Sequence, residues 1–381
     1  MDISRTLDLN RLLTKKSHFL LGPRSTGKST LVKEQLHGKA FLIDLLESDL
    51  FLRLSANPTL LESLVAESRQ NLVVIDEIQK IPFLLDEVHR LIEKKKIHFL
   101  LTGSSARKLK KSQTNLLAGR ARMANLFPLT WYELGKRFDL NRYLLFGGLP
   151  QVYLSDEPQE DLVAYANLYI KEEIQTEALI RSLPPFSRFL VTAALSNGQI
   201  INFTKVGDDA QVSPSTVREY YSILEDTLMG FLLPPFTQTK KRKAIQTAKF
   251  YFFDTGVVHT FMERKSIPEN SGAFGEAFEH FIGMELRAYL SYARKLENLS
   301  YWRSVNRQEV DYLIGKEVAI EVKATKKISK RHLKGLTALQ EEKIFKKYFL
   351  ISQDPLLQEN NNIHCLPWQE FLERLWDGEI L

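Results

Sequence analysis

The sequence predicts an α/β protein built from a doubly wound domain, a helical middle segment and a second, smaller α/β domain. Short apolar runs alternate with helical patterns as far as about Pro150. Helical spacing then dominates, and strand patterns return after Ser271. A chain of 381 residues is too long for one ordinary core, so we expect domains at residues 1–155, 156–265 and 266–381.

Four apolar runs in the first domain have the length expected of buried strands. They are His18–Leu21, Ala40–Ile43, Leu72–Ile75 and His98–Thr102. Helical stretches lie between them, at Ser29–Leu36, Asn57–Glu67 and Phe83–Lys94. Continuously apolar strands are typical of a parallel sheet with helices on both faces, so the first domain is expected to be doubly wound.

The middle segment predicts a winged helix. Helical spacing runs from Glu160 to about Phe236, with a short strand expected at Gln199–Phe203, and Ser213-Pro214 has the pattern of a helix start. Two expected strands, Phe231–Leu233 and Lys249–Phe253, then flank a basic run of Lys240, Lys241, Arg242 and Lys243. This run would sit at the wing tip and suits phosphate contact, whereas the helix before it carries one basic residue, which is poor for groove recognition. A module that binds protein or only joins domains is the alternative.

The composition fits a soluble globular protein. No uncharged apolar run reaches about 18 residues, so no membrane span is expected. The lone cysteine, Cys365, excludes an intrachain disulfide and fits a cytoplasmic compartment. The net charge of +6 permits nucleic-acid binding without requiring it, because affinity for phosphates depends on local clustering.

A glycine-rich motif lies between the first strand and the first helix. Its residues are Gly22, Pro23, Arg24, Ser25, Thr26, Gly27, Lys28 and Ser29, followed by Thr30. Strand, loop and helix together are the context in which this motif forms a P-loop, whose backbone N–H groups and helix N-terminus cradle phosphates. We therefore expect these residues to bind ATP, with Lys28 at the β- and γ-phosphates and Ser29 on Mg²⁺. The alternative, a chance glycine-rich turn, is disfavoured by this context.

Acidic residues end the third apolar run, where the second half of an ATPase site is expected. Asp76 would hold Mg²⁺, and Glu77 would orient the attacking water. Thr102 or Ser104, at the end of the fourth run, would sense the γ-phosphate. Two solvated acids at a strand end would be the better interpretation if no P-loop preceded them.

Two arginines follow the fourth strand. Arg120 or Arg122 would serve as an arginine finger on a neighbouring subunit, which implies a ring or another homo-oligomer. The alternative, a surface arginine, holds for at least one of the pair.

These motifs together resemble a family of prokaryotic AAA-type ATP-binding proteins that carry a C-terminal domain of unknown function. The matching segments are Gly22–Ser29, Asp76-Glu77, Leu101–Ser105, Gly119-Arg120, Phe127–Leu134 and Gly147–Pro150. The resemblance covers nearly the whole chain. It implies a P-loop core with an additional strand, a winged helix and a nuclease-like tail.

Acidic residues in the tail need a joint explanation. A helix at Phe274–Tyr289 precedes strands at Leu299–Arg303, Glu309–Ile314 and Glu317–Lys323, with a further strand at Lys347–Ile351. Glu321 and Lys323 point to one face of their strand because side chains alternate with a period of two. Charges on a buried strand are costly unless they are paired or bound to metal. Asp311 and Glu321 would hold Mg²⁺ or Mn²⁺, Lys323 would orient the nucleophilic water, and Glu279 would complete the pocket.

This order of a helix glutamate, an aspartate and E-x-K resembles the PD-(D/E)xK nucleases. The densest basic stretch of the chain follows it, at Lys323, Lys326, Lys327, Lys330, Arg331 and Lys334. A basic helix beside a carboxylate–metal centre suits a phosphodiester backbone, so DNA is the expected partner. A solvated helix face is the alternative for the basic stretch, and an inactive nuclease fold is the alternative for the cluster.

Two functions remain open. One is an ATP-driven enzyme that processes DNA, in which the P-loop domain powers or switches a nuclease-like tail. The other is a nucleotide-switched binding protein whose nuclease fold is catalytically silent. A small-molecule kinase is disfavoured, because Asp76-Glu77 and the large C-terminal half fit a mechanical ATPase better.

Overall fold

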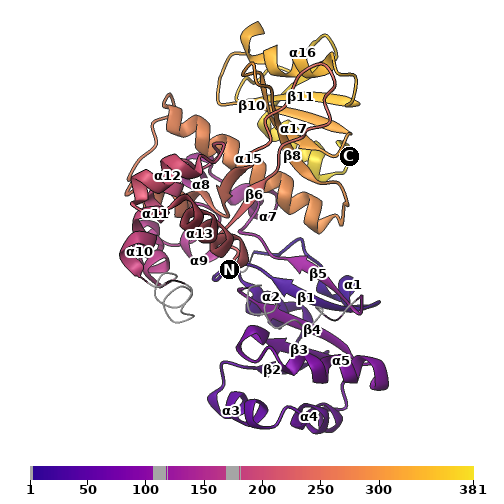
Figure 1. Cartoon of the computed structure of the whole chain (residues 1–381). Coiled ribbons are helices and arrows are strands. Elements are labelled where there is room, and N and C mark those ends of the chain that lie inside the picture. Colours follow the sequence, from indigo (N-terminus) through magenta and orange to yellow (C-terminus); the bar gives the residue numbers. More distant parts are fainter. Residues whose placement is uncertain (1–2, 106–116, 118, 169–179, 181) are drawn as a thin grey trace. The chain divides into compact units, whose positions relative to one another are not determined.

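The computed structural model describes residues 3–105, 117, 119–168, 180 and 182–381. The chain forms two compact units (Figure 1). One comprises Met1–Phe127 and Ile223–Met229, and the other comprises Pro128–Ser222 and Gly230–Leu381. The second unit therefore contains most of the expected middle segment and the whole expected tail.

The first unit is built on a five-stranded parallel sheet in the order β2-β3-β4-β1-β5. The strands are β1 (Ser17–Leu21), β2 (Phe41–Asp44), β3 (Leu72–Asp76), β4 (His98–Gly103) and β5 (Ala121–Asn125). Strand β4 lies between β1 and β3, which is the additional-strand order that the resemblance implied. The four predicted strands are confirmed. Strand β5 was not predicted, because Arg122 and Asn125 interrupt its apolar character.

Short helices surround this sheet. They are α1 (Leu9–Leu13), α2 (Lys28–Leu36), α3 (Ser48–Ala56), α4 (Leu60–Ser68), the 3-10 turn η1 (Ile78–Lys80) and α5 (Leu84–Lys95). The helix predicted at Asn57–Glu67 is confirmed as α4, but it starts at Leu60 rather than at Asn57. Pro58 disfavours a helical conformation at the residue before it, and Asn57 accordingly has φ −140° and ends α3. Apolar residues of the strands and of α5, such as Phe19, Ile75, Phe99, Val88 and Leu91, form the core.

Helices also dominate the first part of the second unit. They are α7 (Trp131–Leu134), η2 (Gly135–Arg137), α8 (Leu140–Phe146), α9 (Pro150–Tyr153), α10 (Pro158–Leu168), α11 (Leu183–Leu195), α12 (Phe203–Ala210), the start of α13 (Pro214–Asp226) and α14 (Thr255–Phe261). Residues 169–179 and 181 of the predicted helical stretch lie outside the described residues. The antiparallel pair β6 (Gly230–Leu233) and β7 (Lys249–Phe252) follows α13.

The strand predicted at Gln199–Phe203 was wrong. Only Ile200 pairs with a strand, through a single bridge to Lys249. Helix α12 already begins at Phe203, because the side chain of Asn202 accepts a hydrogen bond from the backbone N–H of Lys205 and caps the helix.

The tail forms a six-stranded mixed sheet in the order β12-β13-β11-β10-β9-β8. Its strands are β8 (Leu299–Arg303), β9 (Glu309–Ile314), β10 (Val318–Lys323), β11 (Lys347–Ser352), β12 (Gln358–Asn360) and β13 (Ile363–Pro367). Its helices are α15 (Gly272–Tyr292), η4 (Lys330–Leu333), α16 (Lys334–Gln340) and α17 (Trp368–Trp376). The predicted helix and four predicted strands are confirmed, whereas β12, β13 and α17 were not predicted. Antiparallel pairing of β9 and β10 sets Asp311 and Glu321 on neighbouring strands.

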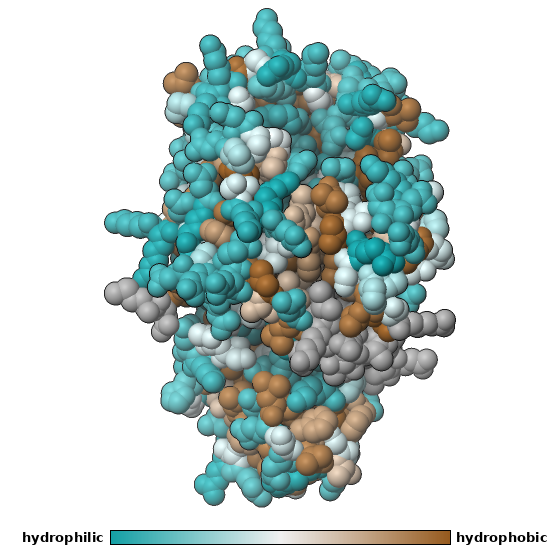
Figure 2. Space-filling model, turned by 90° about the vertical axis from the view of Figure 1, so that its left-hand side faces the viewer, coloured by the Kyte–Doolittle hydropathy of each residue, from teal (hydrophilic) through white to brown (hydrophobic). Residues whose placement is uncertain are grey.

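The face in Figure 2 is largely hydrophilic, and its hydrophobic residues occur in small groups separated by polar ones. Across the described ranges, no helix combines the length and the apolar character needed to cross a membrane.

Candidate functional sites

The P-loop connects β1 to α2 and is closed around its lysine. Gly27 has φ +89°, a conformation that glycine adopts without strain. A Cβ on Gly22 would lie 2.5 Å from the carbonyl oxygen of Leu126, so only glycine fits there. The buried Lys28 donates from Nζ to the carbonyl oxygens of Gly22 and Pro23, at 2.8 and 2.9 Å. The loop therefore has the cradle shape that a phosphate chain requires.

The end of β3 meets the first turn of α2. Ser29 Oγ donates a hydrogen bond to Asp76 Oδ2 at 2.7 Å, and Thr102 Oγ1 at the end of β4 donates to Asp76 Oδ1. Asp76 is 6% exposed. Hydroxyl and carboxylate oxygens are the ligands that Mg²⁺ prefers, so this donor set fits the expected ion.

Glu77 follows Asp76 in the left-handed conformation, with φ +59°. Burial raises the pKa of the Glu77 carboxyl, the nearby Asp76 raises this pKa further, and Lys28 opposes both. The Glu77 side chain is partly exposed. The structure thus brings together Lys28, Ser29, Asp76, Glu77 and Thr102 as predicted from sequence.

Gln79 completes this network, and the sequence patterns gave no reason to select it. Its Nε2 donates to Glu77 Oε2 and, at 3.2 Å, to Ser104 Oγ. The residue is 5% exposed, and its Oε1 is buried without a hydrogen-bond partner. Gln79 therefore connects the acid that follows β3 to the hydroxyl that follows β4.

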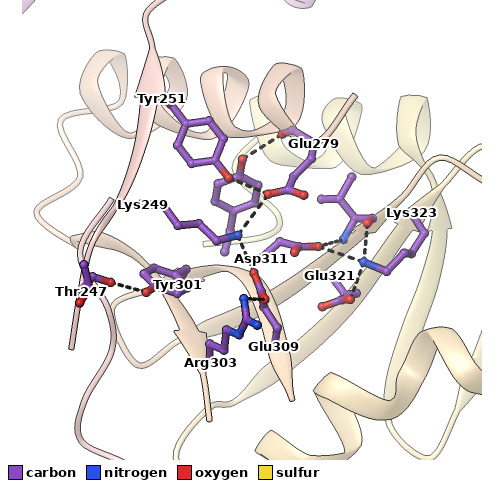
Figure 3. Close-up of polar contacts among 12 residues, drawn as sticks. Thr247, Lys249, Tyr251, Glu279, Tyr301, Arg303, Glu309, Asp311, Glu321 and Lys323 are labelled. Atoms are coloured by element: carbon purple, nitrogen blue, oxygen red, sulfur yellow. Dashed lines mark hydrogen bonds and ion pairs between the residues drawn. The ribbon is translucent and has the colours of Figure 1, made fainter. Parts of the chain in front are cut away.

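A second polar cluster lies on the tail sheet (Figure 3). Lys323 Nζ contacts Glu321 Oε1 at 2.6 Å and Asp311 Oδ2 at 3.4 Å. Asp311 and Glu321 are 4% and 6% exposed. Burial and the neighbouring Asp311 carboxylate raise the pKa of Glu321 well above its usual range. The E-x-K pair and the aspartate therefore meet in space.

Glu279 of α15 joins this cluster from the other side. Its Oε1 accepts a hydrogen bond from Tyr251 Oη at 2.6 Å and contacts Lys249 Nζ at 3.4 Å. Burial raises the pKa of Glu279, which Lys249 opposes and Asp311 reinforces. Lys249 was not among the predicted site residues, because its strand belongs to the preceding segment of the chain.

The basic stretch after β10 is less helical than predicted. Lys326 and Lys327 lie in a loop, and the 3-10 turn η4 begins only at Lys330. Glu342, which follows α16, holds the backbone of the basic run Lys240–Lys243. The N–H groups of Lys240, Lys241 and Arg242 donate to its carboxylate at 2.8–3.0 Å.

Three family models match successive parts of the chain. Residues 14–135 match a model described as an AAA domain, which includes the P-loop, Asp76 and Glu77. The chain carries an AAA domain. Residues 137–267 match a domain of unknown function, DUF8612, and residues 274–371 match another, DUF4143.

Two relatives match the chain at low identity. An uncharacterized protein of Haemophilus influenzae is 22% identical over 62% of this chain, and the match spans 64% of the relative's own length. An uncharacterized protein of Methanocaldococcus jannaschii is 25% identical, and that match covers 82% of this chain and 75% of the relative.

Two solved structures that match parts of the chain are each 11% identical to it. The replication initiator DnaA bound to AMPPCP and single-stranded DNA covers 59% of this chain and 90% of its own length, with a TM-score of 0.31. The Bacillus subtilis DNA clamp loader delta protein covers 58% and 88%, with a TM-score of 0.24.

The two candidate finger arginines lie at the edge of the AAA domain sheet. Arg122 is exposed on β5, the edge strand next to β1. Arg120 Nε donates to Glu93 Oε1 of the same chain. The N-terminal Arg5 was not predicted, yet it donates to the carbonyl oxygens of Thr26 and Phe127, at 2.8 and 2.6 Å, and so supports the P-loop.

Proposed function

We propose that the AAA domain hydrolyses ATP. The observation that carries this is the contact of Ser29 Oγ with Asp76 Oδ2 at 2.7 Å, which sets the two expected ligands of one Mg²⁺ side by side. Lys28 would leave the Gly22 and Pro23 carbonyls to bind the β- and γ-phosphates. Glu77 would orient the attacking water and accept its proton. Mg²⁺, when bound, neutralises charge on the phosphate oxygens.

We propose in addition that the tail grips or cuts a phosphodiester backbone, with DNA as the partner. The donor set suits Mg²⁺ or Mn²⁺, since Asp311 and Glu321 offer carboxylate oxygens and Glu321 Oε2 is buried without a hydrogen-bond partner. Lys323, which is partly exposed, would orient a water and stabilise the negative charge that develops on phosphorus. Glu279 of α15 would complete the pocket from the side opposite Lys323.

The middle segment would couple the two activities as a winged helix. The order of α11, α12, α13 and the β6–β7 pair supports this proposal. The Lys240–Lys243 run, whose backbone is tied to Glu342, would present its basic side chains to phosphates. Arg120 or Arg122 would act on a neighbouring subunit in a homo-oligomer, and the protein would work in the cytoplasm.

A binding protein switched by nucleotide, with a silent nuclease fold, is the second candidate. One observation favours it: two lysines, Lys249 and Lys323, already pair with the carboxylates of the tail cluster. Across the residues that the structure describes, no group of three or more His, Cys, Asp and Glu side chains is arranged to hold a metal ion.

The two candidates differ in what mutation of the tail does. The wild type and the variants Lys28→Ala, Glu77→Gln and Lys323→Ala are assayed for ATPase activity and for Mn²⁺-dependent cleavage of DNA, with and without ATP. Absence of ATP turnover in the wild type would overturn the first proposal. Equal cleavage by wild type and Lys323→Ala would overturn the nuclease proposal. ATP-dependent DNA binding that survives Glu321→Ala, without cleavage, would favour the silent fold.

A further inference from the structure

Lys249 is a buried lysine that faces the carboxylates of the tail. Its Nζ lies 2.7 Å from Glu309 Oε1 and 3.4 Å from Glu279 Oε1, and its side chain is 4% exposed. Burial alone would lower the pKa of Lys249, but Glu279, Glu309 and Asp311 outweigh burial and raise it, so the ammonium is charged. Figure 3 shows this ammonium on the side of Asp311 opposite Lys323.

The partners of Lys249 come from elements that are distant in sequence. Lys249 starts β7, Glu279 lies on α15, and Glu309 starts β9. The ring of Tyr301 lies under the ammonium, 5.2 Å from Nζ, and contributes a cation–π contact. Tyr251 on the same strand bonds the same Glu279 oxygen. The ammonium is therefore held on several sides.

We propose that Lys249 is a built-in cation that occupies one half of the carboxylate cluster. A divalent ion would then bind only in the other half, at Asp311 and Glu321, and Lys249 would keep a second ion from binding between Glu279 and Glu309. This inference rests on the proposed metal-binding role of the tail. The centre is then built from two segments of the chain. Lys249 belongs to the middle segment, whereas the carboxylates belong to the tail.

The charges support this arrangement. Four carboxylates, those of Glu279, Glu309, Asp311 and Glu321, lie in a largely buried cluster, where charges without counter-ions are costly. Lys323 pairs with the last two, and Lys249 pairs with the first two. Arg303 also pairs with Glu309, at 3.3 Å, so the half of Lys249 holds two cations, whereas the half of Lys323 holds one. Only the half of Lys323 retains a buried carboxylate oxygen without a hydrogen-bond partner, on Glu321.

A cavity of about 350 Å³ gives access to Lys249. Its lining includes Lys249, Glu276, Glu279, Arg303 and Glu309. Ions that enter this cavity would reach the ammonium position directly if the charge were removed. Three glutamates and Arg303 would line the cavity once the ammonium is removed, which leaves an excess of negative charge that a divalent cation would offset.

The test uses the full chain with the Asp76→Asn substitution, which weakens ion binding in the AAA domain. Lys249→Met removes the ammonium and keeps most of the length of the side chain. It is expected to lower the melting temperature in EDTA by roughly 10 °C, because it breaks a buried ion pair. Mn²⁺ is expected to restore that loss, and titration with Mn²⁺ alone is expected to give two bound ions per chain instead of one. Lys249→Arg, which keeps the charge, should bind no extra ion.

Lys346→Met is the matched control. Lys346 also pairs with a glutamate, Glu317, at 2.7 Å, but its side chain is 70% exposed, so neither the melting temperature nor ion binding should change. If Lys249→Met does not fold, Lys249→Gln replaces it. An unchanged number of Mn²⁺ ions in the lysine variant would overturn the inference. A change from no ion to one ion would support the role of Lys249 but overturn the proposed ion at Asp311 and Glu321.

Discussion

Ser29 Oγ lies 2.7 Å from Asp76 Oδ2, which joins the first turn of α2 to the end of β3. The two residues are far apart in sequence and come from the two halves of the nucleotide motif. Their contact sets the oxygens for an ion side by side. The chemistry of this centre should therefore depend on single side chains rather than on a large rearrangement.

Glu77→Gln should abolish ATP turnover but keep ATP binding. The amide preserves size while removing the base, so kcat is expected to fall by about 10²–10³-fold, as for the loss of a group that acts in the transition state. Steady-state ATPase assays and binding of a fluorescent nucleotide separate the two effects. Asp76→Asn is the comparison and should weaken binding as well. A kcat near that of wild type in Glu77→Gln would exclude Glu77 from the reaction.

Gln79→Leu should lower kcat by about tenfold with unchanged nucleotide affinity. The substitution removes the donors to Glu77 and Ser104 while keeping the volume, and each hydrogen bond is worth about 1 kcal/mol. The same change in a Glu77→Gln background should have little further effect, because both substitutions act on one group. Additive losses in the double variant would argue for a purely structural role.

Gly147→Ala should destabilise the second unit strongly. Gly147 has φ +73°, and a Cβ there would lie 1.8 Å from Asp254 Oδ1, which accepts hydrogen bonds from the Gly256 and Val257 N–H groups. Backbone strain and the loss of this helix cap are expected to lower the free energy of unfolding by about 3 kcal/mol or more. Gly378→Ala, with φ +81° and 3.8 Å to its nearest neighbour, is the control and should cost only about 1 kcal/mol. Urea unfolding followed by tryptophan fluorescence measures both, and equal costs would refute the clash.

Glu285 should make the stability of the second unit fall as the pH rises. Its carboxyl accepts hydrogen bonds from Trp131 N and Trp376 Nε1, at 2.7 and 2.9 Å, and burial raises its pKa to about 8. Its folded pKa lies above its ordinary value, so its contribution is complete below about pH 4.5 and is lost as the pH rises through about 8. The slope is at most about 1.4 kcal/mol per pH unit.

Glu285→Gln should flatten this dependence. Urea unfolding at several values between about pH 5 and pH 8.5 measures it, and tryptophan fluorescence reports on the second unit alone, since Trp131, Trp302, Trp368 and Trp376 all lie there. The exposed Glu317→Gln is the control. An unchanged slope in the Glu285 variant would assign the pH dependence to other groups.

Local patterns predicted the centre of the nucleotide site well. The P-loop and Asp76 follow strands whose apolar runs are continuous, so motif, strand end and helix start could be placed from neighbouring residues alone. The same is true of Glu321 and Lys323, whose spacing of two sets them on one face of β10. Their meeting with Asp311 follows from a hairpin, which is also a local feature.

Residues that act across the fold could not be predicted in this way. Gln79 and Lys249 have ordinary sequence surroundings, and their roles depend on contacts with β4 and with α15 and β9. Strand β5 has no continuous apolar run and is defined by its pairing with β1. In each case the contact that gives the residue or strand its role is made with another helix or strand. A short stretch of sequence therefore does not contain the information needed to predict it.

Trp131 and Trp376 both bond Glu285, from 154 and 91 residues away in the sequence. During synthesis Trp376 leaves the ribosome long after the strands of the P-loop sheet. Contacts of such long range form slowly. The P-loop unit can therefore acquire its sheet early, whereas the second unit must wait for α17 before its buried glutamate has both donors. A nascent chain stalled before residue 376 would be expected to recruit chaperones through the unfinished second unit.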